Sequence, residues 1–510
     1  MNDVIQLNSL DNICVASKPL SANHELEFGG GIVVVASDIK MGHKVAISAI
    51  AAGEPVRKYG QVIGFASELI NAGAWVHSHN LANGKIVLNH EKAIEQPVVD
   101  SPILSTVFKG IRRADGSVGT RNYIAVISTV NCSATVSKFV ARYFTPDKLI
   151  DFPNVDGVIA LTHETGCGMK QLGQKHQMLN RVLGGFARHP NLAACLIIGL
   201  GCEQATPGTL MLDQKLVQIG SGGTPAGPPV FSMQDLGGTR KTVHAAIEKI
   251  ESMLPLANAV ERSDADINEI ILGTECGGSD GNSGVTANPA LGIASDWIIR
   301  NGGTSILAET SEIYGAEHLL TRRARSIEVA DKLLKLIDWW KWYVGLFGEE
   351  LDNNPSVGNK EGGLTTITEK SLGAIAKAGG STLEDVYQYA ETVDKKGLVI
   401  MDSPGFDPPS VTGMVAGGAN VICFTTGRGS CFGCKPVPSI KIASNTPMYD
   451  RMIDDMDINA GTVLEGESVE DVGQRIFNEI LAVAGGKKTK SELNGFGDEE
   501  FSPWTVGPVL

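Results

Sequence analysis

Short apolar runs that each end in a polar or glycine-rich loop constrain the fold of this chain more than any other feature. The segments between the runs have the spacing of amphipathic helices, and this alternation is typical of a parallel β-sheet with crossover helices. Ligands of open α/β sheets bind beyond the carboxyl ends of the strands, so these loops predict one shared site. The runs are 156–162, 194–200, 268–273, 304–308, 397–401 and 420–425, and the loops after them read HETGCG, GCEQ, TECGGSDGNSG, ETSE, DSPG and TGRGS.

The length of the chain and the changes in its pattern divide it into domains of α/β class with a small all-β domain in front. A chain of 510 residues is too long for one hydrophobic core. Short β-type runs separated by glycines fill the first part, and Pro97 and Pro102 mark a linker after it. The proline- and glycine-rich segment 206–238 indicates a boundary between two α/β domains with largely parallel sheets. The predicted parts are an all-β domain at 1–85, a linker at 86–110, a middle α/β domain at 111–250 and a C-terminal α/β catalytic domain at 251–510.

Charge and cysteine content exclude several classes of protein. The 43 basic and 57 acidic residues give a net charge of −14 without a Lys/Arg cluster, which argues against a nucleic-acid partner. No apolar run approaches the roughly 18 residues of a membrane span, and the first residues show no export signal. We therefore expect a cytoplasmic protein with no membrane partner. Nine cysteines, an odd number, favour free thiols over disulfides and leave several of them available to a metal.

Two histidines that are two residues apart form one candidate metal site. In an extended strand His77 and His79 would point to the same face and could share one ion. Nitrogen ligands suit iron, zinc or manganese. The alternative is that two histidines near the edge of a domain are simply solvated.

Cysteines in polar loops form a second candidate site. A buried cysteine usually behaves as a small hydrophobic residue, and this fits Cys195 and Cys423, which lie inside predicted strands. The loop cysteines fit that role less well. With His163 and Glu203 nearby in the sequence, they could assemble a metal or iron–sulfur site in the folded chain, although no CxxC spacing supports it locally. The candidate ligands are Cys132, Cys167, Cys202 and Cys276.

The loop Gly427-Arg-Gly429 offers backbone N–H groups and a guanidinium group that suit a carboxylate. A phosphate-binding loop would have a similar composition. The sequence has no GxxxxGKS or GxxxxGKT motif and no complete GxGxxG motif that opens a helix after a strand. A carboxylate ligand is therefore the simpler inference, and a nucleotide-dependent oxidoreductase is a weak alternative.

The longest specific motif, CGGSDGNSGVTANP from Cys276 to Pro289, resembles the altronate/galactarate dehydratase family. Segments with the same resemblance extend from about residue 11 to about residue 490. The resemblance implies an N-terminal SAF-type domain with a β-clip-like fold, followed by a middle region and a C-terminal catalytic region. The other segments are Gly42–Lys44, Tyr59–Gly60, Arg113–Gly119, Ile198–Glu203, Asn354–Lys360, Gly362–Gly363, Lys370–Gly373, Thr426–Gly429 and Asp457–Gly461.

The resemblance also implies a reaction and the residues that carry it. It implies dehydration of a hexonate or hexarate to a 2-keto-3-deoxy acid with a divalent metal, iron or manganese. A C–H bond beside a carboxylate is very weakly acidic, so a metal must stabilise the enediolate while a base removes the proton and an acid protonates the departing hydroxyl. We expect His77 and His79 to bind the metal and His163 or His43 to act as the base. The other expected site residues are Lys44, for catalysis or substrate holding, and Asp280, Asn288, Asn359, Lys360 and Arg428 for substrate.

The residues leave alternatives for the cofactor and the substrate. The cofactor is a mononuclear Fe(2+) or Mn(2+), or else an iron–sulfur cluster. The segment His77–Asn80 resembles the altronate branch, whereas Ser430–Gly433 departs from the Thr-Pro-Tyr-Gly of both named dehydratases, so galactarate or another aldarate is an alternative. A related lyase that removes sulfite from sulfolactate carries the SAF-type domain as a separate subunit. A non-catalytic protein that binds or senses sugar acids is a further alternative, and a homodimer is the usual default.

Overall fold

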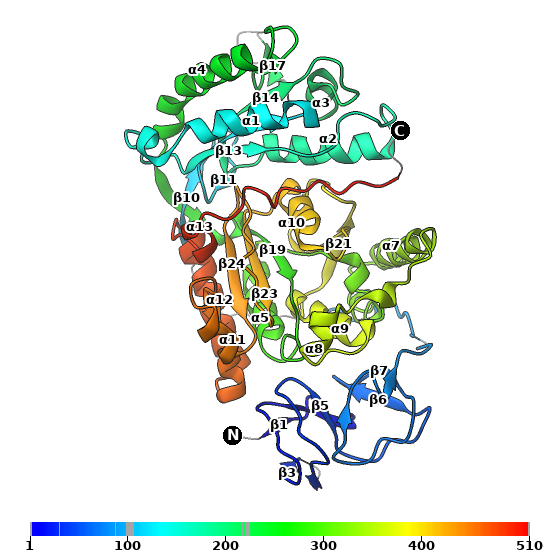
Figure 1. Ribbon diagram of the computed structural model, residues 1–510. Helices are drawn as coiled ribbons and strands as arrows, with labels where there is room; N and C mark the ends of the chain where they lie inside the picture. The colour runs from blue at the N-terminus through cyan, green and yellow to red at the C-terminus, as the bar shows by residue number, and fades with distance from the viewer. Residues whose placement is uncertain are drawn as a thin grey trace.

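The computed structural model describes residues 3–29, 31–86, 88–97, 107–216, 218–219 and 225–507. Three regions lie in a row: the N-terminal region, in blue, at one end, the middle region, in cyan and green, at the other, and the C-terminal region between them (Figure 1). The predicted linker falls partly on residues 98–106, which are outside the described residues. No helix in the described ranges is long and apolar enough to cross a membrane.

The N-terminal region is a small all-β domain, as predicted. Its strands are short because tight turns separate them. At Gly73 φ is +81° and a Cβ atom would lie 1.8 Å from the Val34 carbonyl oxygen, so this turn requires glycine. Apolar strand residues such as Val15, Val45 and Val76 are fully buried. The antiparallel sheets have the orders β1 (Val4–Ile5), β2 (Ile13–Ala16), β5 (Lys44–Ala46), β8 (Trp75–Val76); β6 (Pro55–Lys58), β7 (Gln61–Ala66), β9 (Leu81–Ala82); and β3 (Glu25–Phe28), β4 (Gly31–Val34).

The middle region is built on a four-stranded parallel sheet with helices on both faces. Alternate residues of its strand β12 (Tyr123–Ser128) face opposite layers: Ile124 packs with α1 (Asn131–Tyr143) and α4 (Thr239–Asn258), and Ile127 packs with α2 (Gln174–Ala187). The boundary predicted near residue 250 is wrong, because α4 continues without a break to Asn258. The sheet order is β13 (Gly157–Leu161), β12, β14 (Leu192–Gly199), β17 (Val230–Ser232). The remaining elements are α3 (Pro207–Asp213), the pair β15 (Gln218–Ile219) and β16 (Pro225–Ala226), and the antiparallel set β11 (Val118–Gly119), β10 (Val107–Arg112), β18 (Arg262–Asp266).

The C-terminal region is built on a seven-stranded parallel sheet with β19 (Ile271–Cys276) at its centre. Its neighbours are β20 (Thr304–Leu307) on one side and β23 (Val421–Thr426) on the other. The chain completes one side of the sheet before it crosses to the other, so the carboxyl end of β19 is the topological switch point, where such sheets bind ligands. The full order is β21 (Leu383–Tyr387), β22 (Gly397–Met401), β20, β19, β23, β24 (Ser439–Ala443), β25 (Ile458–Asn459).

Helices cover both faces of this sheet. Buried residues of α5 (Ala287–Arg300) and α12 (Val469–Ala484) form one apolar cluster with β19, β23 and β24, while α10 (Asp407–Ala416) packs on the opposite face. The other helices are α6 (His318–Thr321), α7 (Ile327–Gly345), α8 (Val357–Glu361), α9 (Ile367–Ala374), α11 (Thr446–Arg451) and α13 (Lys490–Leu493), with short 3-10 helices that include η3 (Thr310–Glu312) and η5 (Ile375–Ala378).

The six predicted apolar runs all overlap strands, but these strands belong to two different sheets. The first two runs overlap β13 and β14 of the middle sheet, and the other four overlap β19, β20, β22 and β23 of the C-terminal sheet. The prediction that all six loops meet at one site is therefore wrong, because periodicity locates strands without showing which sheet they join. The loop after β19 contacts the N-terminal domain, where Gly281 touches Gly42. The middle sheet lies at the opposite end of the molecule (Figure 1).

A shared core and the C-terminal tail join the middle and C-terminal regions. Phe186 of α2 and Phe424 of β23 belong to one apolar cluster. The tail, in red in Figure 1, runs across both regions. In it, Phe501 packs edge to face on Phe186, and Trp504 stacks on Trp340 of α7 with ring centroids 5.1 Å apart.

Candidate functional site

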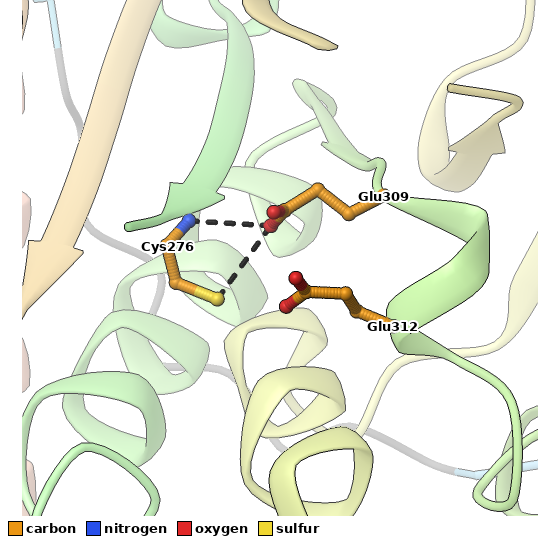
Figure 2. A group of neighbouring side chains, drawn as sticks. All are labelled: Cys276, Glu309 and Glu312. Atoms are coloured by element: carbon orange, nitrogen blue, oxygen red, sulfur yellow. Dashed lines mark hydrogen bonds between the residues drawn. The ribbon is translucent and has the colours of Figure 1, made fainter. Parts of the chain in front are cut away.

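A buried group of acidic and thiol side chains lies at the carboxyl end of the central strands (Figure 2). Cys276 ends β19, Glu309 follows β20, and Glu312 lies in η3. Their ligand atoms all lie within 4.8 Å of one another, and none of the three residues is more than 2% exposed. The Cys276 N–H and thiol both donate to Glu309 Oε2, at 3.3 and 3.5 Å. Glu309 has φ of +63°, a left-handed conformation that is uncommon for glutamate and indicates that the fold holds this residue in place.

Two buried lysines compensate the charge of this group. Lys377 Nζ lies 3.0 Å from Glu309 Oε2 and 2.7 Å from Cys276 Sγ, and Lys370 Nζ lies 2.6 Å from Glu312 Oε1. Burial alone would raise the pKa of Glu309, but Lys377 and Lys370 outweigh burial and lower that pKa. Burial and then the charge of Glu309 raise the pKa of the Cys276 thiol. Burial raises the pKa of Glu312, and Cys276 keeps its proton until a metal displaces it.

Three carboxylate oxygens around Cys276 accept no hydrogen bond from an N–H or hydroxyl group of the described residues, and the carboxyl groups of Glu275 and Glu309 interact with each other. They are Glu275 Oε1, Glu309 Oε1 and Glu312 Oε2, and all are buried. A buried acceptor that lacks a partner is costly, and a cation or a water molecule would satisfy it. Oxygen ligands with a single sulfur suit a divalent metal such as iron or manganese. The donor set of Cys276, Glu309 and Glu312 therefore fits the metal that the sequence predicted.

A second acidic group shares Glu309. The ligand atoms of Glu275, Glu309 and Asp407 also lie within 4.8 Å of one another. Burial, followed by the charges of Glu309 and Glu312, raises the pKa of Asp407 to about 7. Burial and the charge of Glu309 also raise the pKa of Glu275 well above its ordinary value. Asp407, the first residue of α10, is the partly exposed member of this group.

The loop after Cys276 is held together by Asp280. One of its carboxylate oxygens accepts the Ser283 N–H at 2.8 Å and the Ser444 hydroxyl at 2.8 Å, and the other accepts the Asn445 amide at 3.1 Å. Asp280 is 5% exposed. Its carboxylate therefore fixes the shape of the loop, whereas the sequence predicted it to hold substrate.

Asn288 and Asn359, two other predicted substrate ligands, are also occupied by internal hydrogen bonds. The Asn288 amide donates to Gly373 O at 2.9 Å and accepts from the Thr425 hydroxyl at 2.6 Å. Asn359 takes part in the capping box of α8 and donates to Ser279 O at 2.8 Å. Both side chains hold loops of the site together.

Arg428 and Lys360 are the predicted substrate residues that remain accessible. Arg428 is anchored by its backbone N–H, which donates to Gly278 O at 2.8 Å, while its side chain is 46% exposed and pairs with Glu361 at 3.2 Å. An exposed ion pair of this kind contributes little to stability, so a substrate carboxylate can replace Glu361. Lys360 is partly exposed, and its carbonyl group accepts a hydrogen bond from the His77 ring at 2.9 Å. Arg428 and Lys360 thus form a positively charged surface between the C-terminal region and the N-terminal domain, called the seam below.

His77 and His79, the predicted metal ligands, lie in a turn and not in a strand. The strand β8 ends before His77, and residues 77–80 form a hydrogen-bonded turn, so the two side chains do not alternate along a strand. The His77 ring donates to Lys360 O at 2.9 Å and accepts from the neighbouring serine hydroxyl at 2.9 Å, which occupies both nitrogens. Among the described residues, neither histidine belongs to a group of three potential metal ligands. Both rings pack on Trp75, each with its centroid 5.0 Å away.

His43 lies beside these rings and is neutral. Trp75 Nε1 donates to His43 Nδ1 at 3.1 Å, so the Nε2 of His43 carries its proton and donates to Glu361 O at 3.2 Å. Burial lowers the pKa of His43 to about 4. With both nitrogens engaged, His43 positions the seam and is poorly placed to act as the predicted base.

Lys44 belongs to a buried trio that docks the N-terminal domain on the C-terminal region. Lys44 and Lys58 each lie 2.9 Å from the carboxylate of Glu369 on α9, and all three side chains are 0% exposed. Lys44 Nζ also donates to Gly363 O at 2.7 Å. Burial lowers the pKa of Lys44 to about 8, whereas the two ammonium groups outweigh burial and lower the pKa of Glu369. The predicted catalytic Lys44 is thus enclosed, and it acts as a positioning residue.

His163 and three of the predicted thiols lie in the middle region, apart from the acidic group. The His163 ring donates to Ser128 O at 3.0 Å and accepts from the Thr165 hydroxyl at 3.0 Å, and burial lowers its pKa to about 4. The fold therefore does not bring His163 together with His43 or Lys44. The three exposed thiols, which follow β12, β13 and β14, are Cys132, Cys167 and Cys202.

Sequence reasoning missed most of the buried charges. The loop ETSE was singled out, and its two acids after a strand were a usable signal for Glu309 and Glu312. Lys377 lies 101 residues beyond Cys276, and no local pattern connects the two. Lys370 and Glu369 stand in a segment that resembles the family, but nothing in the sequence shows that they are buried and paired.

Three family models match consecutive parts of the chain. The altronate/galactarate dehydratase SAF domain matches residues 2–84, the second domain of D-galactarate dehydratase/altronate hydrolase matches 110–258, and the C-terminal domain of D-galactarate/altronate dehydratase matches 267–509.

Characterised relatives resemble the chain over most of its length. It is 33% identical to altronate dehydratase of Bacillus subtilis over 518 aligned positions, which cover 100% of both chains. It is 36% identical to galactarate dehydratase (L-threo-forming) of Escherichia coli, over 95% of this chain and 93% of that protein. It is 31% identical to the (2R)-sulfolactate sulfo-lyase subunit beta of Chromohalobacter salexigens, over 77% of this chain and 96% of that one. The acidic site at a switch point, the three matched domains and these relatives show that the chain belongs to the altronate/galactarate dehydratase family and is a carbon–oxygen lyase.

Proposed function

We propose that this chain is a metal-dependent hydro-lyase that removes water from an altronate-like hexonate to give a 2-keto-3-deoxy acid. The unpartnered oxygens of Glu309 and Glu312 beside Cys276 carry the proposal. They form a cation-binding donor set at the edge of the sheet where ligands bind. Fe(2+) or Mn(2+) fits this set. A divalent metal held there makes the C–H bond beside a substrate carboxylate more acidic.

The accessible charged groups of the chain have the properties that the reaction requires. Arg428 can bind a carboxylate through two parallel N–H bonds, and Lys360 adds positive charge at the same seam. Arg428 donates its backbone N–H to Gly278, so its loop contacts the loop that follows Cys276. Asp407 is the partly exposed carboxyl group among those acids, and its position suits transfer of a proton.

Two segments near Arg428 bear on the choice between an altronate-like substrate and an aldarate. His77–Asn80 lies at the seam beside Lys360, and Ser430–Gly433 directly follows Arg428. The first segment favours an aldonate, whereas the second differs from both named dehydratases. Identities of 33% and 36% to the altronate and galactarate enzymes do not decide between them. Galactarate is the main alternative substrate, and a sulfolactate-type elimination is the second. We also propose a cytoplasmic location, because all nine cysteines are free thiols.

The proposal is tested by a panel of sugar acids assayed for 2-keto acid formation. The protein is purified without oxygen, loaded with Fe(2+) or Mn(2+), and given altronate, gluconate, galactarate, glucarate and sulfolactate. We expect the fastest turnover with altronate and no turnover after the metal is removed with a chelator. Binding of sugar acids without product from any of them would support the sensing protein and contradict a lyase.

Replacement of Arg428 with glutamine is expected to raise the KM for the sugar acid about 10- to 100-fold, with a smaller change in kcat. A hydrogen bond to a charged group contributes roughly 1.5–3 kcal/mol, which corresponds to this change. Michaelis curves of the two proteins give the result. Arg325→Gln is the matched control, because Arg325 is also exposed and paired with a glutamate, Glu384. Equal KM values for Arg428→Gln and the control would remove Arg428 from the substrate site.

A further inference from the structure

Three exposed cysteines stand at the carboxyl ends of three adjacent parallel strands in the middle region. Cys132 follows β12, Cys167 follows β13 and Cys202 follows β14. The sheet order β13, β12, β14 makes these strands direct neighbours. The acidic group of Cys276 belongs to another sheet, so the proposed function makes no use of these thiols.

Hydrogen bonds tie the three cysteine-bearing loops to one another. The Asn131 N–H donates to Thr165 O at 2.9 Å, which joins the first loop to the second. The Ala205 N–H donates to Gly166 O at 3.0 Å, which joins the second loop to the third. A Cβ atom on Gly166 would lie 2.6 Å from Val130 Cα, so the backbones of the first two loops are in close contact.

The buried side chain of Glu203 also forms hydrogen bonds with these loops. It is 4% exposed, and its two carboxylate oxygens accept from the Thr129 hydroxyl at 2.9 Å and from the Gly201 N–H at 2.7 Å. The first and third loops are therefore joined as well. Three thiols are thus carried on a rigid, mutually bonded set of loops that opens to solvent.

The three sulfur atoms are too widely spaced to share a single metal ion. A single zinc ion would need its thiolates about 3.8 Å apart, because Zn–S bonds in a tetrahedral site are about 2.3 Å long. In the described part of the chain, which includes all three cysteines, their sulfur atoms do not all lie within 4.8 Å of one another. An iron–sulfur cluster gives each cysteine its own iron atom, so it accommodates a wider set of thiols.

We propose that Cys132, Cys167 and Cys202 bind a 4Fe–4S cluster at this edge of the middle sheet. Each thiol would give up its proton as its sulfur–iron bond forms, and these three exposed cysteines would ligate three of the four irons. Cys132 lies in the first turn of the 13-residue helix α1, whose N-cap Val130 supplies no side-chain hydrogen bond. The dipole at that end of the helix favours the anionic cluster. Gln234 Nε2 lies 3.5 Å from Cys202 Sγ, a contact of the kind that tunes cluster sulfurs.

The test uses the full-length protein, purified without oxygen and reconstituted with ferrous iron and sulfide. We expect a broad visible absorbance, with acid-labile sulfide at about four per chain and about four irons beyond any ion held by the acidic group. A triple variant with Cys132, Cys167 and Cys202 changed to serine is expected to lose the absorbance, the sulfide and these four irons, and each single change is expected to lower them. Cys431→Ser is the matched control, because Cys431 is also exposed but lies in the C-terminal region. Circular dichroism and thermal unfolding of the variants show that the fold is kept.

The outcome is separable from that of the proposed function. Glu309→Gln is expected to keep the visible absorbance in full, because Glu309 belongs to the other sheet. Zinc in place of iron, a wild-type protein without iron and sulfide after reconstitution, or an undiminished cluster in the triple serine variant would each overturn the proposal.

Discussion

Replacing Glu369 with glutamine is expected to lower the free energy of unfolding by about 3–5 kcal/mol, the usual cost of removing one partner from a buried ion pair. Lys44 and Lys58 both depend on this carboxylate, and neither has any exposure to water. A glutamine keeps the volume but leaves two ammonium groups without a counter-charge. Because the lysines and Glu369 lie on opposite sides of the contact between the N-terminal domain and α9, the loss is expected there first.

Hydrogen exchange measured by mass spectrometry locates the effect, and chemical denaturation gives its size. In Glu369→Gln, peptides that contain Lys44, Lys58 and Gly363 are expected to exchange faster, while peptides from the middle region keep their wild-type rates. Glu384→Gln is the control, because Glu384 pairs with the exposed Arg325 and such pairs contribute about 0–1 kcal/mol. If Glu369→Gln and the control unfold alike, the buried trio does not hold the domains together.

The same trio predicts how stability depends on pH. The folded pKa of Glu369 lies below its ordinary value of 4.5, so its pairing stabilises the protein fully above about pH 4.5 and this contribution is lost as the pH falls further. Lys44 has a folded pKa of about 8, below its ordinary 10.5, so between these values the unfolded chain binds more protons. In that window the contribution of Lys44 to stability rises with pH. Glu369→Gln is expected to remove the acid dependence that belongs to this residue.

Changing Glu309 to glutamine is expected to reduce turnover at least about 100-fold, the upper range for loss of a group that supports a metal site. The change removes a negative charge and an unpartnered oxygen beside Cys276 and Glu312. It also leaves the ammonium group of Lys377 buried beside a protonated thiol, so the single variant is expected to be less stable too. Cys276→Ser, which keeps the Lys377–Glu309 pair, is expected to lose activity with a smaller loss of stability.

A double variant separates catalysis from folding at this position. Glu309→Gln combined with Lys377→Met removes both charges and is expected to recover most of the stability that the single change loses, because no buried charge remains unpaired. Its turnover is expected to stay as low as that of Glu309→Gln. The measurements are kcat with saturating metal and the midpoint of thermal unfolding. Recovery of activity together with stability would show that Glu309 acts only through the fold.

The sequence predicted the elements of this protein better than their long-range contacts. The β-branched runs became strands, because alternating or continuous apolar patterns report burial along one segment. The sequence did not predict that these strands form two separate sheets, because strand pairing depends on residues far apart in the chain. The extended strand expected at His77 and His79 is absent for a local reason: the strand ends before them and a turn follows. Cys276 was found through its motif, whereas Lys377 was not, since its role exists only in the folded structure.

The tail that carries Phe501 and Trp504 also bears on how the protein unfolds. Phe501 packs on α2 of the middle region and Trp504 packs on α7 of the C-terminal region, so one segment fastens the two regions together. Detachment of this segment would expose apolar surface on both regions at once. The two regions are therefore expected to lose their structure in one cooperative step.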